Sequence, residues 1–171
     1  MKIVFKKKIL ALGGHLKGRF CFVSGASVKF SPVLGNLGDP GSLALFEKAI
    51  KPLRPDAVAY DLHPEYASTR IAMDLMSRLK IKGIGVQHHH AHIASCMAEH
   101  GLSGNVIGVS FDGTGFGQDG NIWGGEFLIC GYRDFNRAAH LEYIRLPGGE
   151  KAILEPWRTA LSLLYEAYGQ K

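Results

Sequence analysis

The sequence has little cysteine and no long apolar run, and these absences exclude several classes of protein. Its three cysteines, Cys21, Cys96 and Cys130, are widely spaced and form no C-x-x-C pair. Such spacing argues against a disulfide framework and against a cysteine-ligated zinc site. No apolar run approaches the ~20 residues of a membrane-spanning helix, and the N-terminus lacks a signal segment with a cleavage site. We therefore expect a cytoplasmic protein without a membrane anchor.

Composition and charge fit a globular protein and argue against a nucleic-acid ligand. Hydrophobic residues make up 46% and charged residues 20% of the 171 residues, so one core or two small cores can form. Much of the net charge of +5 lies in the N-terminal stretch MKIVFKKKIL. No aromatic platform or second basic block accompanies these lysines, so they are interpreted as a solvated end of the chain.

The order of expected elements is typical of a mixed α/β fold. Short β-rich runs bounded by glycine predict strands near the N-terminus, and apolar residues at helical spacing follow them. The expected strands up to residue 102 lie at 7–14, 18–32, 57–60 and 83–87, and the expected helices at 43–53, 66–81 and 88–101. Asp39 and Ser42 are both candidates for the N-cap of the first helix.

After residue 102 the pattern changes, which predicts two lobes, at residues 1–102 and 103–171. In the second lobe we expect strands at 105–111, 122–132 and 138–146, a glycine-rich loop at 112–120 and a helix at 157–169. Because that lobe stops soon after its helix, we expect the chain to be a piece of a larger protein.

The stretch QHHHAH contains four histidines within five positions at the start of an expected helix. His88 and His92 are four residues apart and therefore share one helix face. Two imidazoles in this arrangement can ligate one metal ion. Because two histidines leave an ion short of ligands, we expect a third ligand, a carboxylate, from elsewhere in the chain.

Other interpretations of the histidines remain open. A zincin metalloprotease needs glutamate directly after the first histidine, but His89 stands there, so a metallohydrolase is disfavoured. Histidines at a helix start can also make ordinary hydrogen bonds and hold no metal. His89 and His90 project in other directions, where they can support the ligands, contact a substrate or face solvent.

The stretch DGTGFGQDG is rich in glycine, which lets backbone N–H groups approach an anion closely. It is not a Walker loop, because no G-K-S/T follows, and not a Rossmann turn, because no helix follows. Strands on both sides predict a hairpin that presents Asp112 and Thr114, similar to the phosphate-binding hairpins of actin-like ATPases. A calcium loop is disfavoured because Phe116 stands at a ligand position, and a purely structural hairpin remains an alternative.

Taken together, several stretches resemble the hydrogenase maturation carbamoyltransferase family, HypF. The resemblance is to its large C-terminal domain, which is related to the tRNA threonylcarbamoyl-transfer proteins. The stretches that carry it are LALGGHLKGRFCF, DLHPEYASTRIA, VQHHHAHIASCMAEHG, FDGTGFGQDGNIWGGEFL and LPGGEKAILEPWRTAL. They occur in family order and cover nearly the whole chain from about residue 9.

The resemblance implies an actin-like (ASKHA) ATPase fold, with the first lobe and the beginning of the second. It also implies a reaction in which ATP and carbamoyl phosphate give a carbamoyl adenylate in a separate domain. The domain seen here would pass the carbamoyl group to the C-terminal cysteine of the partner HypE. HypE then forms the thiocyanate that supplies the cyanide ligands of nickel–iron hydrogenase.

Site residues carry over from the family motifs by position. The resemblance implies His88, His92 and Asp112 as metal ligands, with zinc, iron or another first-row ion suiting the ligands and magnesium accompanying the nucleotide. Asp112 would also act on the phosphates, beside nucleotide-binding backbone at Gly113, Thr114, Gly115 and Gly117. His63, in DLHPEY, is a candidate catalytic residue, and the alternative is that it fixes its turn.

The chain also departs from the family pattern. Asn36 stands where the family usually has the aspartate of GDL, which puts any role of that position in doubt. The acylphosphatase-like, zinc-finger and adenylate-forming domains and the later acidic metal ligand have no counterpart in these 171 residues. We therefore expect that the chain does not complete the reaction alone, and the alternative is a non-catalytic metal-binding fragment or HypE-docking module. A bare lobe surface would favour a homodimer.

Overall fold

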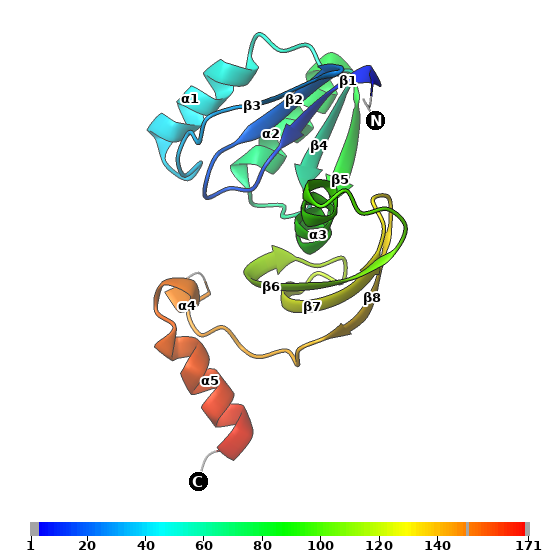
Figure 1. The fold of residues 1–171 in the computed structure, drawn as a ribbon. Coiled ribbons are helices and arrows are strands. Elements are labelled where there is room, and N and C mark those ends of the chain that lie inside the picture. The colour runs from blue at the N-terminus through cyan, green and yellow to red at the C-terminus, as the bar shows by residue number, and fades with distance from the viewer. Residues whose placement is uncertain (1–3, 150, 170–171) are drawn as a thin grey trace. The chain divides into compact units, whose positions relative to one another are not determined.

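A computed structural model describes residues 4–149 and 151–169 of the chain (Figure 1). The chain divides into two compact units. The first comprises the described residues up to His92 together with Gly115–Ile122, and the second comprises Ile93–Thr114 with the described residues from Trp123 onward. No helix within the described ranges is long and apolar enough to cross a bilayer.

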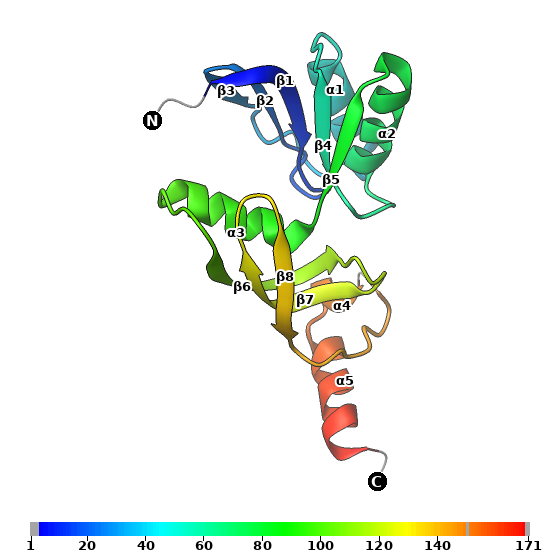
Figure 2. The same ribbon diagram turned by 90° about the vertical axis from the view of Figure 1, so that its right-hand side faces the viewer.

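The first unit contains a five-stranded sheet with the order β3-β2-β1-β4-β5 (Figures 1 and 2). Its strands are β1 (Phe5–Leu12), β2 (Phe20–Gly25), β3 (Ser27–Phe30), β4 (Ala57–Asp61) and β5 (Lys82–Val86). The strands β1, β2 and β3 form an antiparallel meander, whereas β4 pairs in parallel with both β1 and β5. Parallel pairs need crossover connections, and a helix supplies each one here.

The helices α1 (Pro40–Ile50) and α2 (Ala67–Leu79) cover one face of this sheet (Figures 1 and 2). α1 begins earlier than the expected residue 43, because Pro40 stands at the first helical turn, where its missing N–H costs nothing. Asp39 is the N-cap residue, but its side chain makes no capping bond. α1 ends before Pro52, which has no backbone N–H to continue the helical hydrogen bonds.

The core of the first unit lies between these helices and the sheet. Leu10 of β1 and Val58 of β4 meet Phe46 of α1 and Leu75 of α2 in one apolar cluster. Leu10, Val58 and Phe46 are fully buried. Burying these side chains fixes which face of each strand points inward, and thereby fixes the register of the sheet.

The second unit contains the three-stranded sheet β6-β7-β8 and most of helix α3 (His88–Glu99). The strands are β6 (Val106–Phe116), β7 (Ile122–Cys130) and β8 (Phe135–His140). Their core joins Ile93 and Met97 of α3 with Trp123, Leu128 and Cys130 of β7. Two further helices follow, α4 (Lys151–Leu154) and α5 (Trp157–Tyr168).

Three sequence-based expectations about the second half differ from the structure. β6 continues through Phe116, so residues 112–116 are strand and not loop, and the turn itself spans residues 117–121. β8 lies at Phe135–His140 instead of 138–146, because Glu126 to Cys130 of β7 pair with it there. The short helix α4 lies outside the helix expected at 157–169. The lobe boundary at residue 102 stays a prediction, and the compact units divide inside α3.

Candidate metal centre

His88 and His92 lie one turn apart at the start of α3, and their side chains meet. The Nε2 atoms of the two rings are 3.2 Å apart. The helix brings them together because residues four positions apart lie on one face. The two histidines therefore share one helix face, and their role as metal ligands stays a prediction.

The spacing of the two nitrogens fits a single metal ion. Two imidazole nitrogens at ~2.0–2.1 Å from one tetrahedral ion lie roughly 3.3 Å from each other. The observed 3.2 Å between His88 Nε2 and His92 Nε2 matches that separation. The donor set is therefore suited to a divalent first-row metal ion, and the second nitrogen of His88 has its own partner.

That partner is Asp61, the last residue of β4. Its Oδ2 lies 2.7 Å from Nδ1 of His88, and its side chain is 7% exposed. A carboxylate on the far nitrogen of a ligating histidine is the usual support for a metal-bound imidazole. Nothing local in the sequence predicts this contact, because the two residues are 27 positions apart.

A cavity of about 380 Å³ opens beside the histidine pair within the first unit. Its lining includes Gly13, Arg19, Cys21, Asp61, His88 and His92. Burial raises the pKa of the Cys21 thiol, which makes it a poorer nucleophile at neutral pH. The cavity therefore offers room for a small ligand next to the two imidazoles, without an activated cysteine.

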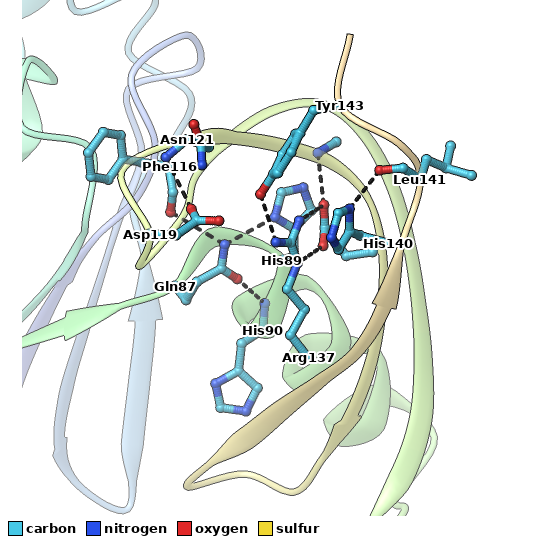
Figure 3. A network of polar contacts seen from close by, with 12 residues as sticks. Gln87, His89, His90, Phe116, Asp119, Asn121, Arg137, His140, Leu141 and Tyr143 are labelled. Atoms are coloured by element: carbon cyan, nitrogen blue, oxygen red, sulfur yellow. Dashed lines mark hydrogen bonds and ion pairs between the residues drawn. The ribbon is translucent and has the colours of Figure 1, made fainter.

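Gln87 organises the residues around the start of α3 (Figure 3). Its Oε1 accepts a hydrogen bond from the backbone N–H of His90 at 2.9 Å, which caps the helix. Its Nε2 lies 3.1 Å from Nδ1 of His89 and donates to the backbone oxygen of Phe116 at 3.4 Å. Gln87 is 2% exposed. Sequence reasoning assigned no role to Gln87, although it opens the QHHHAH motif.

Gly115 of β6 is packed against the histidine cluster so closely that a side chain does not fit. A Cβ atom there would lie 2.5 Å from Cε1 and 2.8 Å from Nδ1 of the buried His89 ring. This close packing explains why the strand has glycine at this point.

We expect Gly115→Ala to lower the free energy of unfolding by about 1–3 kcal/mol, because the His89 ring or the strand must shift. Urea unfolding followed by far-UV circular dichroism measures the change. Gly113→Ala is the matched control in the same strand, because a Cβ there meets no atom within 4 Å. Equal costs for the two variants would contradict the packing argument.

The structure gives His63 contacts that hold the turn after β4. Its ring stacks on Tyr66, with the centroids 4.1 Å apart, and its Nδ1 accepts a hydrogen bond from the backbone N–H of Glu65 at 3.3 Å. The ring also lies 5.4 Å from that of Phe116. These contacts support the alternative that His63 fixes its turn, and its catalytic role stays a prediction.

The predicted phosphate-binding residues lie on β6 and the turn after it. Asp112 belongs to the second unit, and its Oδ1 accepts a hydrogen bond from the backbone N–H of Gly113 at 2.7 Å. Gly117 donates its N–H to the oxygen of Asn121, which closes the turn. The roles of Asp112, Gly113, Thr114, Gly115 and Gly117 at a metal or nucleotide stay predictions.

The second unit contains an ion pair that sequence reasoning did not find (Figure 3). Arg137 of β8 donates from Nε to Oε2 of Glu126 at 2.6 Å and from Nη2 to Oε1 at 3.0 Å. Its guanidinium also lies 3.9 Å from the centroid of the Trp123 ring and donates to the Tyr143 hydroxyl at 2.7 Å. Glu126 and Arg137 are eleven residues apart, so only the β7–β8 register brings them together.

Comparison with known proteins assigns both halves of the chain to one family. The model of the HypF Kae1-like domain matches residues 5–99. The chain belongs to the HypF carbamoyltransferase family. The model of the second subdomain of the carbamoyltransferase Kae1-like domain matches residues 108–171. The family assignment made from the sequence motifs is thereby confirmed.

Relatives with this family name come from several organisms. The carbamoyltransferase HypF homolog of Cupriavidus necator is 44% identical over 163 residues, which cover 92% of this chain and 41% of that protein. Carbamoyltransferase HypF of a Synechocystis species is 40% identical over 171 residues, covering 96% of this chain and 22% of that protein. The chain thus spans less than half the length of each of these relatives.

Solved structures of the family have the same fold. A full-length HypF in its phosphate- and nucleotide-bound form is 43% identical and superimposes with a TM-score of 0.87, over 97% of this chain and 22% of that one. HypF of T. kodakarensis is 40% identical with a TM-score of 0.88, over 98% of this chain and 23% of that one. The mixed α/β fold is therefore the fold of the HypF Kae1-like domain.

Proposed function

We propose that this chain forms a metal- and nucleotide-binding part of a carbamoyltransferase of hydrogenase maturation. In this proposal, ATP and carbamoyl phosphate yield a carbamoyl adenylate in domains outside these 171 residues. The carbamoyl group then passes to the C-terminal cysteine of HypE. The observation that carries the proposal is the 3.2 Å separation of His88 Nε2 and His92 Nε2 in a domain of this family.

Three residues would hold the metal in this proposal. His88 and His92 present their Nε2 atoms from one face of α3, and Asp112 supplies a carboxylate. A bound divalent ion, zinc or iron, would polarise the carbamoyl carbonyl and stabilise charge on the leaving phosphate. The three ligands alone leave coordination positions for the substrate and for a further acidic ligand.

The remaining residues of the site would bind and orient the substrate. The glycine-rich backbone from Gly113 to Gly117 would lie beside the phosphates of ATP or the adenylate, together with magnesium. The cavity beside His88 and His92 would take the carbamoyl end. The attacking thiolate would come from HypE, so this chain's own cysteines need not be nucleophiles, and the raised pKa of Cys21 fits that role for HypE.

The wider setting of the proposal follows the family. The fold would be the first lobe of an actin-like ASKHA ATPase with the start of the second. The protein would work in the cytoplasm, with no nucleic-acid partner and no membrane partner, and the open lobe surface would favour a homodimer.

The first test is metal content. We expect the purified untagged chain, loaded with zinc or ferrous iron and freed of excess ion, to hold about one ion per chain by mass spectrometry. His92→Ala is expected to lose that ion, because one imidazole with one carboxylate binds a first-row metal far more weakly. His100→Ala is the matched control, because His100 is an exposed histidine just after α3.

The outcomes separate the alternatives. One ion in the wild type and in His100→Ala, but none in His92→Ala, would support the metal centre. A wild-type chain that holds no ion after reloading would contradict it. Equal metal in all three proteins would assign the binding to other residues.

A second candidate function is a non-catalytic metal-binding or HypE-docking module. The observation that favours it is that the chain spans 41% and 22% of the length of the two relatives described above. Carbamoyl transfer from supplied carbamoyl adenylate to a peptide carrying the HypE C-terminal cysteine discriminates the two. Transfer above the rate without protein supports the enzyme part, whereas peptide binding without transfer supports the docking module.

A further inference from the structure

The parallel pairing of β4 and β5 brings a carboxylate to the start of α3. Asp61 is the last residue of β4 and pairs with Val86, the last residue of β5. The chain enters α3 two residues later, at His88. Because parallel strands end at the same edge of a sheet, the Asp61 side chain and the first histidine of the helix lie at one edge.

Both carboxylate oxygens of Asp61 have defined partners. Oδ1 accepts a hydrogen bond from the backbone N–H of His63 at 2.9 Å, and Oδ2 lies 2.7 Å from Nδ1 of His88. The backbone oxygen of Asp61 also accepts from the Thr69 hydroxyl at 2.9 Å, which ties the turn to α2. The carboxylate is 7% exposed, so its orientation is fixed by these contacts and not by solvent.

These contacts determine where the His88 ring carries its proton. A carboxylate only accepts hydrogen bonds, so the 2.7 Å contact requires a proton on Nδ1 of His88. A neutral ring with its proton on Nδ1 has its lone pair on Nε2, the atom 3.2 Å from Nε2 of His92. The ring is therefore held in the form that presents a lone pair to an ion between the two histidines.

We propose that Asp61 is a positioning residue that fixes His88 in the Nδ1–H tautomer and so prepares Nε2 to ligate a metal. This inference rests on the metal centre of the proposed function and adds to it a residue outside the ligand set. Asp61 itself touches neither the ion nor the substrate in this proposal. It acts only through the imidazole.

An asparagine at this position tests the tautomer directly. If its Oδ1 keeps the bond from the His63 N–H, its NH₂ group faces Nδ1 of His88 and donates to it. The ring then carries its proton on Nε2, where a metal cannot bind. If the asparagine amide were flipped, its NH₂ group would face the N–H of His63. Both groups are donors, so that hydrogen bond would be lost.

The experiment compares wild type, Asp61→Asn and Asp61→Glu. Long-range proton–nitrogen NMR of the metal-free chain reports the tautomer of His88, with the signals assigned by a His88→Gln variant. Titration with cobalt(II), followed by its visible absorption bands, reports the affinity and the ligand geometry. We expect the Nδ1–H form in the wild type, the Nε2–H form in Asp61→Asn, and a 10- to 100-fold weaker cobalt affinity in that variant.

Two control variants show whether Asp61→Asn acts on the His88 ring or disturbs the folding of the chain. Asp74→Asn changes an exposed aspartate of α2 that pairs with Arg78, and should leave both readouts unchanged. Asp61→Glu keeps an acceptor and should restore the Nδ1–H form in part. Circular dichroism of each variant shows whether the sheet and helices are intact.

The possible results distinguish this inference from the proposed function. An unchanged tautomer and cobalt affinity in a folded Asp61→Asn would overturn the inference, while wild-type cobalt binding would still support the metal centre. The reverse result, a tautomer switch in Asp61→Asn with no cobalt binding by the wild type, would support the orienting role and contradict the metal centre.

Discussion

Replacing Arg137 with methionine is expected to lower the free energy of unfolding by about 3–5 kcal/mol. The reason is the carboxylate that would remain. Glu126 is 1% exposed and accepts two hydrogen bonds from the Arg137 guanidinium. Removing the guanidinium leaves a buried charge that keeps the hydrogen bond from the N–H of Gly124, at 3.2 Å. Breaking a buried pair in this way costs far more than the pair itself contributes.

In the wild type, the surroundings of Arg137 favour its charged form. Burial alone would lower the pKa of Arg137, but the hydrogen bonds to Glu126 and Tyr143 and the negative charge of Glu126 raise it above its usual value. The guanidinium also stacks on the Trp123 ring, which is 3% exposed. Lysine at this position keeps the charge but not the paired hydrogen bonds, so Arg137→Lys should recover only part of the stability.

Trp123 itself provides the measurement. Urea unfolding is followed by tryptophan fluorescence in a Trp157→Phe background, so that the signal comes from the ring beneath Arg137. Arg133→Met, an exposed arginine four residues earlier, is the control and should change stability by less than about 0.5 kcal/mol. The double variant Arg137→Met with Glu126→Leu removes both charges and should be more stable than Arg137→Met alone. A loss below about 1 kcal/mol in Arg137→Met would contradict the buried-pair argument.

The second large effect is expected in the core of the first unit. Phe46 of α1 is fully buried between the helices and the sheet, and its ring meets that of Phe20 edge to face, with the centroids 5.7 Å apart. Truncation to alanine removes the apolar contacts and leaves a cavity that close-packed neighbours fill only in part. We expect Phe46→Ala to lower the free energy of unfolding by about 3–5 kcal/mol.

Hydrogen exchange measured by mass spectrometry on peptides from β1 and β4 locates this loss in the first unit. Leu45→Ala is the matched control, because Leu45 is the preceding residue of the same helix but is 56% exposed. The control should leave exchange in these strands within about 0.5 kcal/mol of the wild type. Similar losses for the two variants would mean that Phe46 is not the centre of this core.

Local patterns in the sequence predict the elements and part of the site. The spacing of His88 and His92 is local, so a helix fixes their meeting before any tertiary contact is considered. The strands β4 and β5 were predictable from their short apolar runs, and the helix α5 from its helical spacing of apolar residues. Each of these patterns is complete within a short stretch of sequence. The spacing alone does not assign His88 and His92 a role, and the resemblance to the family suggests that they are metal ligands.

The contacts that depend on strand register could not be predicted. Asp61 meets His88, and Glu126 meets Arg137, only because particular residues of two strands lie opposite each other. A shift of one residue would send these side chains to the other face of the sheet. The end of β6 was misplaced for a related reason. Glycines within Asp112–Phe116 favour a loop by themselves, but here one of them allows close packing on His89.

The crossover through α2 has a consequence for comparing distant members of the family. Asp61 and His88 are 27 positions apart, yet their meeting depends only on where β4 and β5 end. Whole turns could be inserted into or deleted from α2 without separating the two side chains, provided that both strands keep their last paired residues. Alignments of remote homologues should therefore be anchored on the final residue of each strand, with gaps assigned to the intervening helix. A homologue with a much longer α2 can then be searched for the same aspartate.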